Sequence, residues 1–438
     1  MESVRAFVVL LGLACVGCAE GEAALDDGRL PCPPTHYSCD IAEPDCAAGV
    51  LDLTACVRGD ELPELPKINR LTAAQFGEQL RREDEEDKAG PSPWDPVLRA
   101  LGLLPASETL REAAIAQAVD SVAAFYDPET KQVSVITDAG SEHADPRERM
   151  YVLAHEFTHL LQDRAHDLLK LDKQASSSTD RAMALGMLVE GEATVTSTRV
   201  LLRLMRRSPE DFDFPRFFDS LEESLLEGIV SAPSPLAATM QSLSYSAGGR
   251  YVAKVWDQRG RSAVDDLFEA APLTAADWLA LDTDNPTATR ARPLDCAPPL
   301  APEGFELYEL DRLGAAGVLA MLASIDKVEL ELAGELVDDA FALYVERGAA
   351  DPAAAPVIGV WRMRFRSPKA TDRFFALFQA RGIGLRRSGS ELVMRVSSGD
   401  ALTELTGDAL DACPAMDELE PKHSASSQPN AALKRLWH

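Results

Sequence analysis

Basic residues are scarce in this sequence compared with acidic ones. Its 438 residues include 43 lysines and arginines against 71 aspartates and glutamates, which gives a net charge of −28. A surface of that sign repels a phosphate backbone, so nucleic acid is excluded as a partner. No internal repeat is visible either. Hydrophobic residues make up 46% of the chain, which is ample for packed cores.

Long hydrophobic runs are also missing. The run "AFVVLLGLACVGC" at residues 6–18 holds roughly ten to twelve apolar residues, too few to span a bilayer. Together with Arg5 it predicts an export signal over residues 1–18. Its end, Val-Gly-Cys18, resembles the lipobox of bacterial lipoproteins, although Cys15 replaces the usual leucine. We therefore expect an exported protein, anchored to the outer membrane or cell envelope by a lipid on Cys18; plain secretion is the alternative.

The C-x-x-C spacing of a zinc ribbon is absent, so the cysteines are expected to form disulfides in an oxidising compartment. Removal of the signal leaves six of them. Four are clustered: Cys32, Cys39, Cys46 and Cys56. These four allow three pairings, and the sequence leaves the choice open. Elimination suggests a further bridge between Cys296 and Cys413.

The order of helix and strand patterns predicts an α+β protein with a mainly helical domain and a small hairpin before its central helix. "FYDPETKQVSVI" at residues 125–136 has the pattern of a β-hairpin, and "PVIGVWRMRFRS" and "GLRRSGSELVMRVSS" predict strands near the carboxyl end. The expected divisions are a signal peptide at 1–18, a cysteine- and proline-rich segment and linker at 19–65, the mainly helical domain at 66–285, a small α+β domain at 303–413 and a polar tail at 414–438.

Three helices are predicted in the central part of the chain. Ser107 is a plausible N-cap for a helix that reaches about residue 125, and residues 176–205 predict a second long helix. Between them, Asp145 and the following proline and glutamate signal the start of a helix that contains "YVLAHEFTHLLQDRAHD". No residue in "LLQDRAHDLL" is expected to interrupt that helix, which puts His166 about 10 Å from His159 along the axis, too far to share an ion.

The central helix carries the H-E-x-x-H pattern. His155 and His159 lie four residues apart, so both rings can face one ion. Glu156 lies about 100° around the helix, where it can act as general base on water without being a ligand. This spacing predicts a Zn²⁺ site. The alternative is an ordinary half-buried helix whose histidines bond to neighbouring backbone.

A catalytic zinc site needs a third protein ligand. A third histidine in H-E-x-x-H-x-x-G-x-x-H is excluded, because Gln162 and Ala165 occupy the required positions. A glutamate from the following helix is the other source, and "LVEGEA" offers Glu190 and Glu192. These two lie about 200° apart on a helix, so only one can face the metal.

"EGEA" is similar to the E-G-x-A segment of the aminopeptidase N family, and "YSAG" to its Y-x-x-G segment. The resemblance implies that Glu190 is the third ligand and that Tyr245 donates a hydrogen bond to the oxyanion, with Tyr251 as a competitor. The motif order is similar to the gluzincin metallopeptidases, and more closely to uncharacterised bacterial exported proteins with "HE.TH.LQD" and "VEG.A" segments. This resemblance implies that residues 66–285 form a zincin-like catalytic domain. The gap before Glu190 is longer than in aminopeptidase N, and no G-x-M-E-N-like exopeptidase segment is present.

The resulting expectation is an exported zinc metallopeptidase that hydrolyses peptide bonds of a peptide or protein substrate. In folds of the related group the strand before the metal helix pairs with extended substrate, which here assigns "QVSVI" as the edge strand. One alternative is an inactive zinc-binding envelope lipoprotein with a structural or partner-binding role. The other is a structural or adhesion module in which the motif is accidental.

Overall fold

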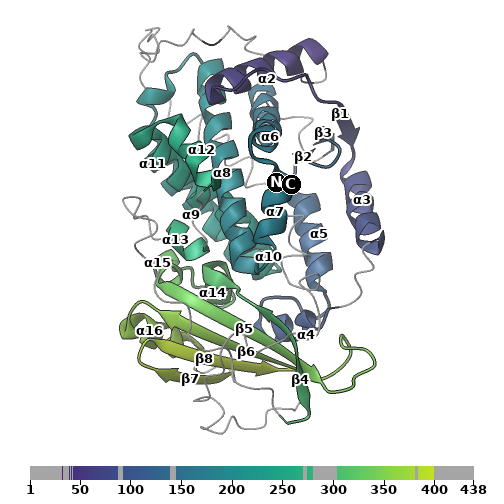
Figure 1. Ribbon diagram of the computed structural model, residues 1–438, viewed down its shortest axis with the longest axis vertical. Helices are drawn as coiled ribbons and strands as arrows, with labels where there is room; N and C mark the ends of the chain where they lie inside the picture. The colour runs from purple at the N-terminus through teal and green to yellow at the C-terminus, as the bar shows by residue number, and fades with distance from the viewer. Residues whose placement is uncertain are drawn as a thin grey trace.

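The computed structural model describes residues 32, 39, 41, 43–86, 92–138, 145–269, 274–279, 303–379 and 383–398. It is an α+β structure in which a helical body with a small sheet at its side lies above a larger sheet (Figure 1). The predicted signal with Cys18, the predicted Cys296–Cys413 bridge and the predicted polar tail lie outside the described residues.

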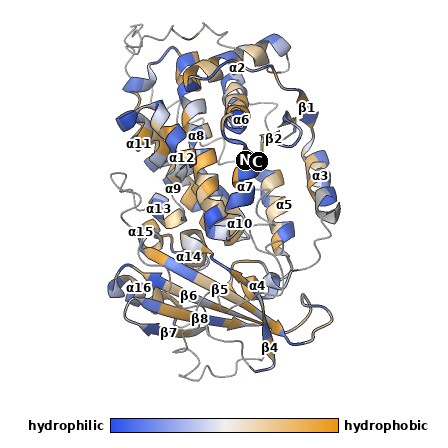
Figure 2. Cartoon of the chain, in the orientation of Figure 1, coloured by the Kyte–Doolittle hydropathy of each residue, from blue (hydrophilic) through white to orange (hydrophobic). Residues whose placement is uncertain are grey.

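The helical body is built around two long helices that pack against each other, α6 (Pro146–His166) and α8 (Thr179–Leu204). The other described helices of this part are α2 (Pro44–Arg58), α3 (Ala73–Glu86), α4 (Trp94–Leu101), α5 (Leu110–Ser121), α7 (Leu168–Ala175), η2 (Pro209–Asp211), α9 (Phe214–Ser231), α10 (Pro235–Leu243), η3 (Ser244–Gly248), α11 (Gly249–Arg259), α12 (Arg261–Glu269) and α13 (Ala275–Leu279). Figure 2 shows hydrophobic and hydrophilic residues side by side on most helices, as expected for amphipathic helices around a shared core.

Helix α6 begins as predicted and ends earlier than predicted. Asp145 is its N-cap, and the Asp145 Oδ1 accepts a hydrogen bond from the N–H of Arg147 at 2.9 Å. Asp167 interrupts the helix, because its φ of 57° lies in the left-handed region; its side chain then caps α7. The expectation of an unbroken helix through this segment was therefore wrong, since an aspartate tolerates this conformation where most residues do not.

Helix α5 begins two residues later than predicted. Thr109, not Ser107, is its N-cap. Thr109 and Glu112 form a reciprocal capping box, in which each side chain accepts a hydrogen bond from the backbone N–H of the other residue. The Thr109 side chain accepts from the Glu112 N–H at 3.1 Å. A threonine followed three residues later by a glutamate is the stronger N-terminal signal.

The small sheet has the strand order β1-β3-β2 and contains β1 (Ile68–Leu71), β2 (Ala124–Asp127) and β3 (Gln132–Ile136). The predicted hairpin is confirmed as the antiparallel β2–β3 pair. β3 is nevertheless the central strand, because β1 pairs with it in parallel. The expectation that "QVSVI" is an edge was wrong, since β1, just after the predicted linker, supplies an extra strand that the sequence patterns did not indicate. β2 is the edge that packs against α6.

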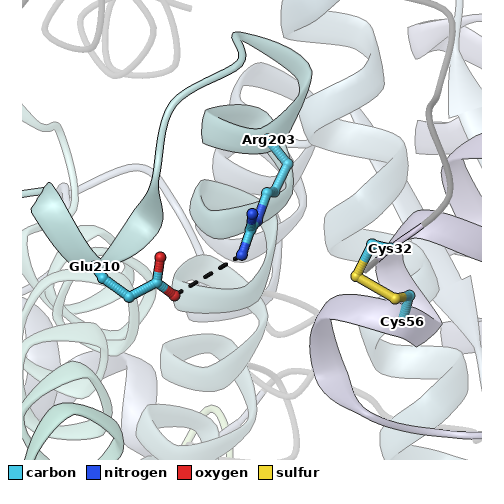
Figure 3. The surroundings of a disulfide bond; sticks show 4 residues. All are labelled: Cys32, Cys56, Arg203 and Glu210. Carbon is cyan, nitrogen blue, oxygen red and sulfur yellow. Dashed lines mark ion pairs between the residues drawn. A yellow bond between two sulfur atoms is a disulfide. The ribbon is translucent and has the colours of Figure 1, made fainter. Parts of the chain in front are cut away.

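The cysteine-rich segment is tied to the helical body by α2. Its disulfides are Cys32–Cys56 and Cys39–Cys46, which selects one of the three pairings. α2 crosses α6 and α8 (Figure 1), and its buried Val50 and Leu53 share a core with Phe157. Figure 3 shows the Cys32–Cys56 bridge near the ion pair of Arg203 and Glu210.

The larger sheet is antiparallel with the strand order β4-β5-β6-β8-β7. Its strands and helices are β4 (Phe305–Asp311), α14 (Gly314–Ala323), α15 (Leu330–Gly334), β5 (Leu336–Glu346), β6 (Val357–Phe365), α16 (Pro368–Phe378), β7 (Gly384–Ser388) and β8 (Glu391–Ser397). The predicted carboxyl-terminal strands are thus confirmed. α4 packs on this sheet, where Trp94 Nε1 donates to Glu309 Oε2 at 2.9 Å. One hydrophobic core runs through both parts.

Candidate metal centre

Three buried side chains from two helices converge at the middle of the helical body. His155 and His159 come from α6 and Glu190 from α8, and their potential ligand atoms all lie within 4.8 Å of one another. His155 Nε2 is 3.0 Å from Glu190 Oε2, and His159 Nε2 is 3.5 Å from Glu190 Oε1. The helix packing therefore assembles the ligand set that the sequence predicts.

The group is compact enough to hold a metal ion. The two imidazoles approach different oxygens of Glu190, at 3.0 and 3.5 Å, and one ligand atom from each residue lies within 4.8 Å of the others. Two imidazoles and one carboxylate can hold a divalent metal ion and leave a fourth position open.

The electrostatics of the site keep Glu190 ionised. Burial alone would raise the pKa of Glu190, but the neighbouring His159 and His155 hold that pKa below its usual value. Burial also lowers the pKa of His155, but the hydrogen bond and charge of Glu190 outweigh burial and raise that pKa. A buried carboxylate that remains charged is suited to bind a cation.

Glu156 lies beside the ligands without belonging to them. Burial, followed by repulsion from Glu190, raises the pKa of Glu156 to about 7, although His155 and the N–H of Tyr126 act in the opposite direction. Its Oε2 atom is buried and has no hydrogen-bond partner within the described part of the chain. An unsatisfied buried carboxylate oxygen indicates a position where a bound molecule supplies the missing donor.

Tyr245 approaches from the opposite side on the π-helical turn η3. Its ring stacks on His155 with centroids 5.8 Å apart, and its hydroxyl donates to Glu190. Burial and the charges of Glu190 and Glu156 raise the pKa of Tyr245 well above its usual value, so it remains a proton donor. Tyr251 lies elsewhere, against Trp278 at 4.6 Å.

Two glycines allow η3 to pack closely against α8, the helix that carries Glu190. A Cβ on Gly191 would lie 2.4 Å from the carbonyl carbon of Gly248, and a Cβ on Gly248 would lie 2.1 Å from the carbonyl oxygen of Met187. Both contacts involve backbone atoms, which cannot move aside as a side chain can. The glycines of the "EGEA" and "YSAG" segments therefore bring Glu190 and Tyr245 together.

Glu192 faces away from the three ligands. Its carboxylate accepts from Arg58 Nε at 3.0 Å, lies 3.3 Å from Arg261 Nη2 and accepts from Gln162 Nε2 at 2.9 Å. Of the two glutamates left open, Glu190 is therefore the one that lies with the histidines, and Glu192 is not. Sequence patterns missed the contacts of Gln162 and Arg58. The position of Gln162, one helical turn after His159, was a usable signal for the first of them.

His166 does not belong to the metal group. Its Nε2 lies 3.3 Å from Asp265 Oδ1, and its ring stacks on Phe268 with centroids 4.1 Å apart. The sequence excluded it for its distance along a continuous helix. In the structure α6 ends at His166, and this residue still lies apart from the two histidines and Glu190, in contact with Asp265 and Phe268.

A cavity of about 160 Å³ adjoins the ligands and Glu156. Its walls are mainly apolar, with Val122, Val152, Leu221 and Leu225 among them. Ala124 of the edge strand β2 also lines it, and Gln117 Nε2 donates to Gln241 Oε1 at 2.7 Å on the lining. The cavity thus lies between a strand edge and an apolar wall, with the ligands and Glu156 also among its lining residues.

No protein-family model, no curated protein and no solved structure matches this chain. The resemblance to gluzincins therefore stays a prediction that rests on the motifs. Among the helices that the structure describes, none is both long and apolar enough to cross a membrane.

Proposed function

We propose that this chain is a zinc-dependent peptidase with His155, His159 and Glu190 as metal ligands. The observation that carries the proposal is that Glu156 lies beside a complete set of possible ligands. Glu156 is a buried carboxylate, and its Oε2 atom has no hydrogen-bond partner in the described part of the chain. A purely structural metal site has no use for such a group. Zinc suits the two imidazoles and one carboxylate better than magnesium or calcium, which prefer oxygen ligands.

Each surrounding side chain has a part in the proposed hydrolysis. Bound Zn²⁺ would supply Lewis acidity and lower the pKa of water toward neutrality. Glu156 accepts the proton of the attacking water and passes it to the leaving nitrogen. The Tyr245 hydroxyl, which donates to Glu190 in the structure, turns to the carbonyl oxygen and donates a hydrogen bond to it as negative charge develops there.

The proposed substrate is an extended stretch of peptide or protein that lies along β2. The N–H of Ile136 donates to the carbonyl of Ala123, and alternation along an antiparallel pair turns the backbone groups of Ala124 and Tyr126 away from β3. The N–H of Tyr126 meets Glu156, and Ala124 lines the cavity. A peptide added at this edge would have its backbone beside the ligands.

The proposed location is outside the cytoplasm, with a lipid anchor on Cys18. Two disulfides in the amino-terminal segment support an oxidising compartment. The sequence of residues 1–18 supports export and lipidation.

The test compares metal content and proteolysis of wild type, Glu156→Gln and Glu190→Ala. Glu391→Gln serves as a control, since Glu391 is a carboxylate held by Arg362 and Arg364 on the distant sheet. We expect one zinc per chain in wild type, Glu156→Gln and the control, and a strong loss in Glu190→Ala. An unstructured protein should be cleaved by wild type and the control only.

Other outcomes would point to the alternatives. Stoichiometric zinc without any cleavage would favour an inactive zinc-binding envelope lipoprotein. No zinc in the wild type after reconstitution, and no loss of stability with a chelator, would make the H-E-x-x-H motif accidental and leave a structural or adhesion module.

A further inference from the structure

A buried chain of hydrogen bonds leads from the metal centre to the cysteine-rich segment. His159 Nδ1 lies 2.8 Å from Gln162 Oε1, and Gln162 Nε2 donates to Glu192 Oε2 at 2.9 Å. Glu192 in turn accepts from Arg58 Nε at 3.0 Å and from Arg58 Nη2 at 3.3 Å. Arg58 ends α2, two residues after Cys56, which is bridged to Cys32.

The orientation of the Gln162 amide follows from its partners. Its Nε2 donates to the carbonyl oxygen of Val189 at 2.9 Å as well as to Glu192, and both partners are acceptors only. The amide oxygen is therefore the atom that faces His159. Because that oxygen accepts and cannot donate, Nδ1 of His159 must carry the hydrogen. In the neutral imidazole, the Nε2 atom, which is the one nearer Glu190, then presents its lone pair to a metal ion.

Glu192 can hold this amide only while its own charge is compensated. Its side chain is fully buried, and an isolated carboxylate at such a site is costly. Arg58 meets both of its oxygens in a two-pronged contact, and Arg261 Nη2 lies 3.3 Å from Oε1. Arg58 is itself buried, so α2 must pack on the helical body for this contact to exist.

We propose that Gln162, Glu192 and Arg58 are positioning residues that fix the Nδ1–H tautomer of His159 and thereby set the affinity of the metal centre. The disulfide-stapled segment is then a part of the metal centre, although it supplies no ligand. Partners of this kind orient metal-binding histidines and raise affinity. The inference rests on the proposed function only in taking His159 as a metal ligand.

The first experiment measures the zinc dissociation constant of the full chain by competition with a chromophoric chelator. Gln162→Leu removes the acceptor at Nδ1, and Arg58→Met removes the far end of the chain. Each should raise the dissociation constant about ten- to hundredfold. The double variant should match Gln162→Leu alone, because both changes act through the same imidazole. Glu391→Gln, which loses a carboxylate between two arginines elsewhere, should bind zinc as wild type does.

The second experiment reads the tautomer directly in the wild type, and a variant serves only to assign the signal. Wild type labelled with ¹⁵N-histidine is studied without metal at about pH 9, where imidazoles are neutral, and His159 is assigned by its loss in His159→Asn. The expected result is a protonated Nδ1. A protonated Nε2, an unchanged dissociation constant in Gln162→Leu, or additive effects in the double variant would overturn the inference.

These readouts separate the inference from the proposed function. Zinc-dependent cleavage with an unaffected Gln162→Leu variant would leave the peptidase standing and remove the positioning role. A correct tautomer and a weakened Gln162→Leu variant without cleavage of any substrate would do the reverse.

Discussion

Glu190 and Glu192 lie two residues apart on one helix, are equally buried and have opposite surroundings. Histidines hold the pKa of Glu190 below its usual value against the effect of burial. Burial likewise opposes ionisation of Glu192, but Arg58 and Arg261 lower its pKa. Both are therefore charged, one toward a cation site and the other toward arginines. The side chains that surround each carboxylate therefore determine what it can bind.

Tyr245 provides a test at the residue scale. Tyr245→Phe should lower kcat about a hundredfold, because the oxyanion loses a donor, while zinc content and KM change little. Steady-state kinetics on a fluorogenic peptide would measure both constants. Tyr251→Phe is the control, since Tyr251 is a buried tyrosine of the same segment that packs on Trp278. Equal kcat values for the two variants would remove the assigned role of Tyr245.

The sequence predicts the residues of the candidate metal centre better than it predicts the side chains that contact them from behind. His155, Glu156 and His159 follow from helical spacing alone, which is local information. Gln162 was considered only as the residue that excludes a third histidine, and its bond to His159 requires knowledge of where Glu192 points. Arg58 lies more than a hundred residues from that glutamate. No periodicity links two such positions.

At the scale of helices and strands, too, contacts between neighbouring segments could be predicted from the sequence, and pairings between distant segments could not. The hairpin of β2 and β3 was predictable from two β-prone runs around a turn. The parallel pairing of β1 with β3 joins residues more than sixty positions apart, and it changed the edge strand from "QVSVI" to β2. The break at Asp167 was also missed, because it depends on a left-handed backbone that a sequence pattern does not reveal.

The contact of α8 with η3 gives a prediction at this scale. Gly248→Ala places a methyl group 2.1 Å from a backbone oxygen of α8, so either helix must shift. We expect the free energy of unfolding to fall by about 3 kcal/mol or more, and kcat to fall with it as Tyr245 moves. Urea unfolding would measure the first effect. Gly384→Ala on β7 is the control, because its nearest contact is an ordinary 3.5 Å. A Gly248→Ala variant as stable as this control would contradict the close approach.

The whole molecule is joined at a cluster of buried carboxyls between the helical body and the larger sheet. Asp311 of β4 accepts from the N–H of Thr179 at 2.8 Å and from its hydroxyl at 2.6 Å, so the sheet caps α8. Asp339 accepts from Trp361 Nε1 at 2.7 Å, and Asp180 accepts from the N–H of Ala275 at 3.0 Å. The helix that carries Glu190 is thus held by the carboxyl-terminal strands.

This junction should make stability depend on pH. Burial, with a contribution from the charge of Asp339, raises the pKa of Asp311 to about 6, against the hydrogen bonds from Thr179 and Arg312. A carboxyl with a raised pKa in the folded state stabilises the fold when protonated. That stabilisation is complete below the unfolded-state pKa near 4 and is lost as pH rises through about 6.

The measurement is urea unfolding of wild type and Asp311→Asn across that range. Asparagine imitates the protonated carboxyl, so wild type should lose on the order of 3 kcal/mol relative to the variant between about pH 4 and pH 7. Asp180 and Asp339, whose pKa values burial also raises, add to the slope in both proteins, and the share of Asp339 is smaller in the variant because its repulsion with Asp311 is lost. Parallel pH profiles for the two proteins would refute the assignment.

The bare backbone contact between Gly191 and Gly248 has a mechanical consequence. Side chains between two helices act as soft spacers that let one helix fluctuate against the other. Here the backbones touch without such a layer, so a thermal displacement of α8 carries η3 with it. We therefore expect the distance from Glu190 to Tyr245 to vary less than the position of either residue. The proposed ligand and the proposed oxyanion donor would then keep their separation while the rest of the body moves around them.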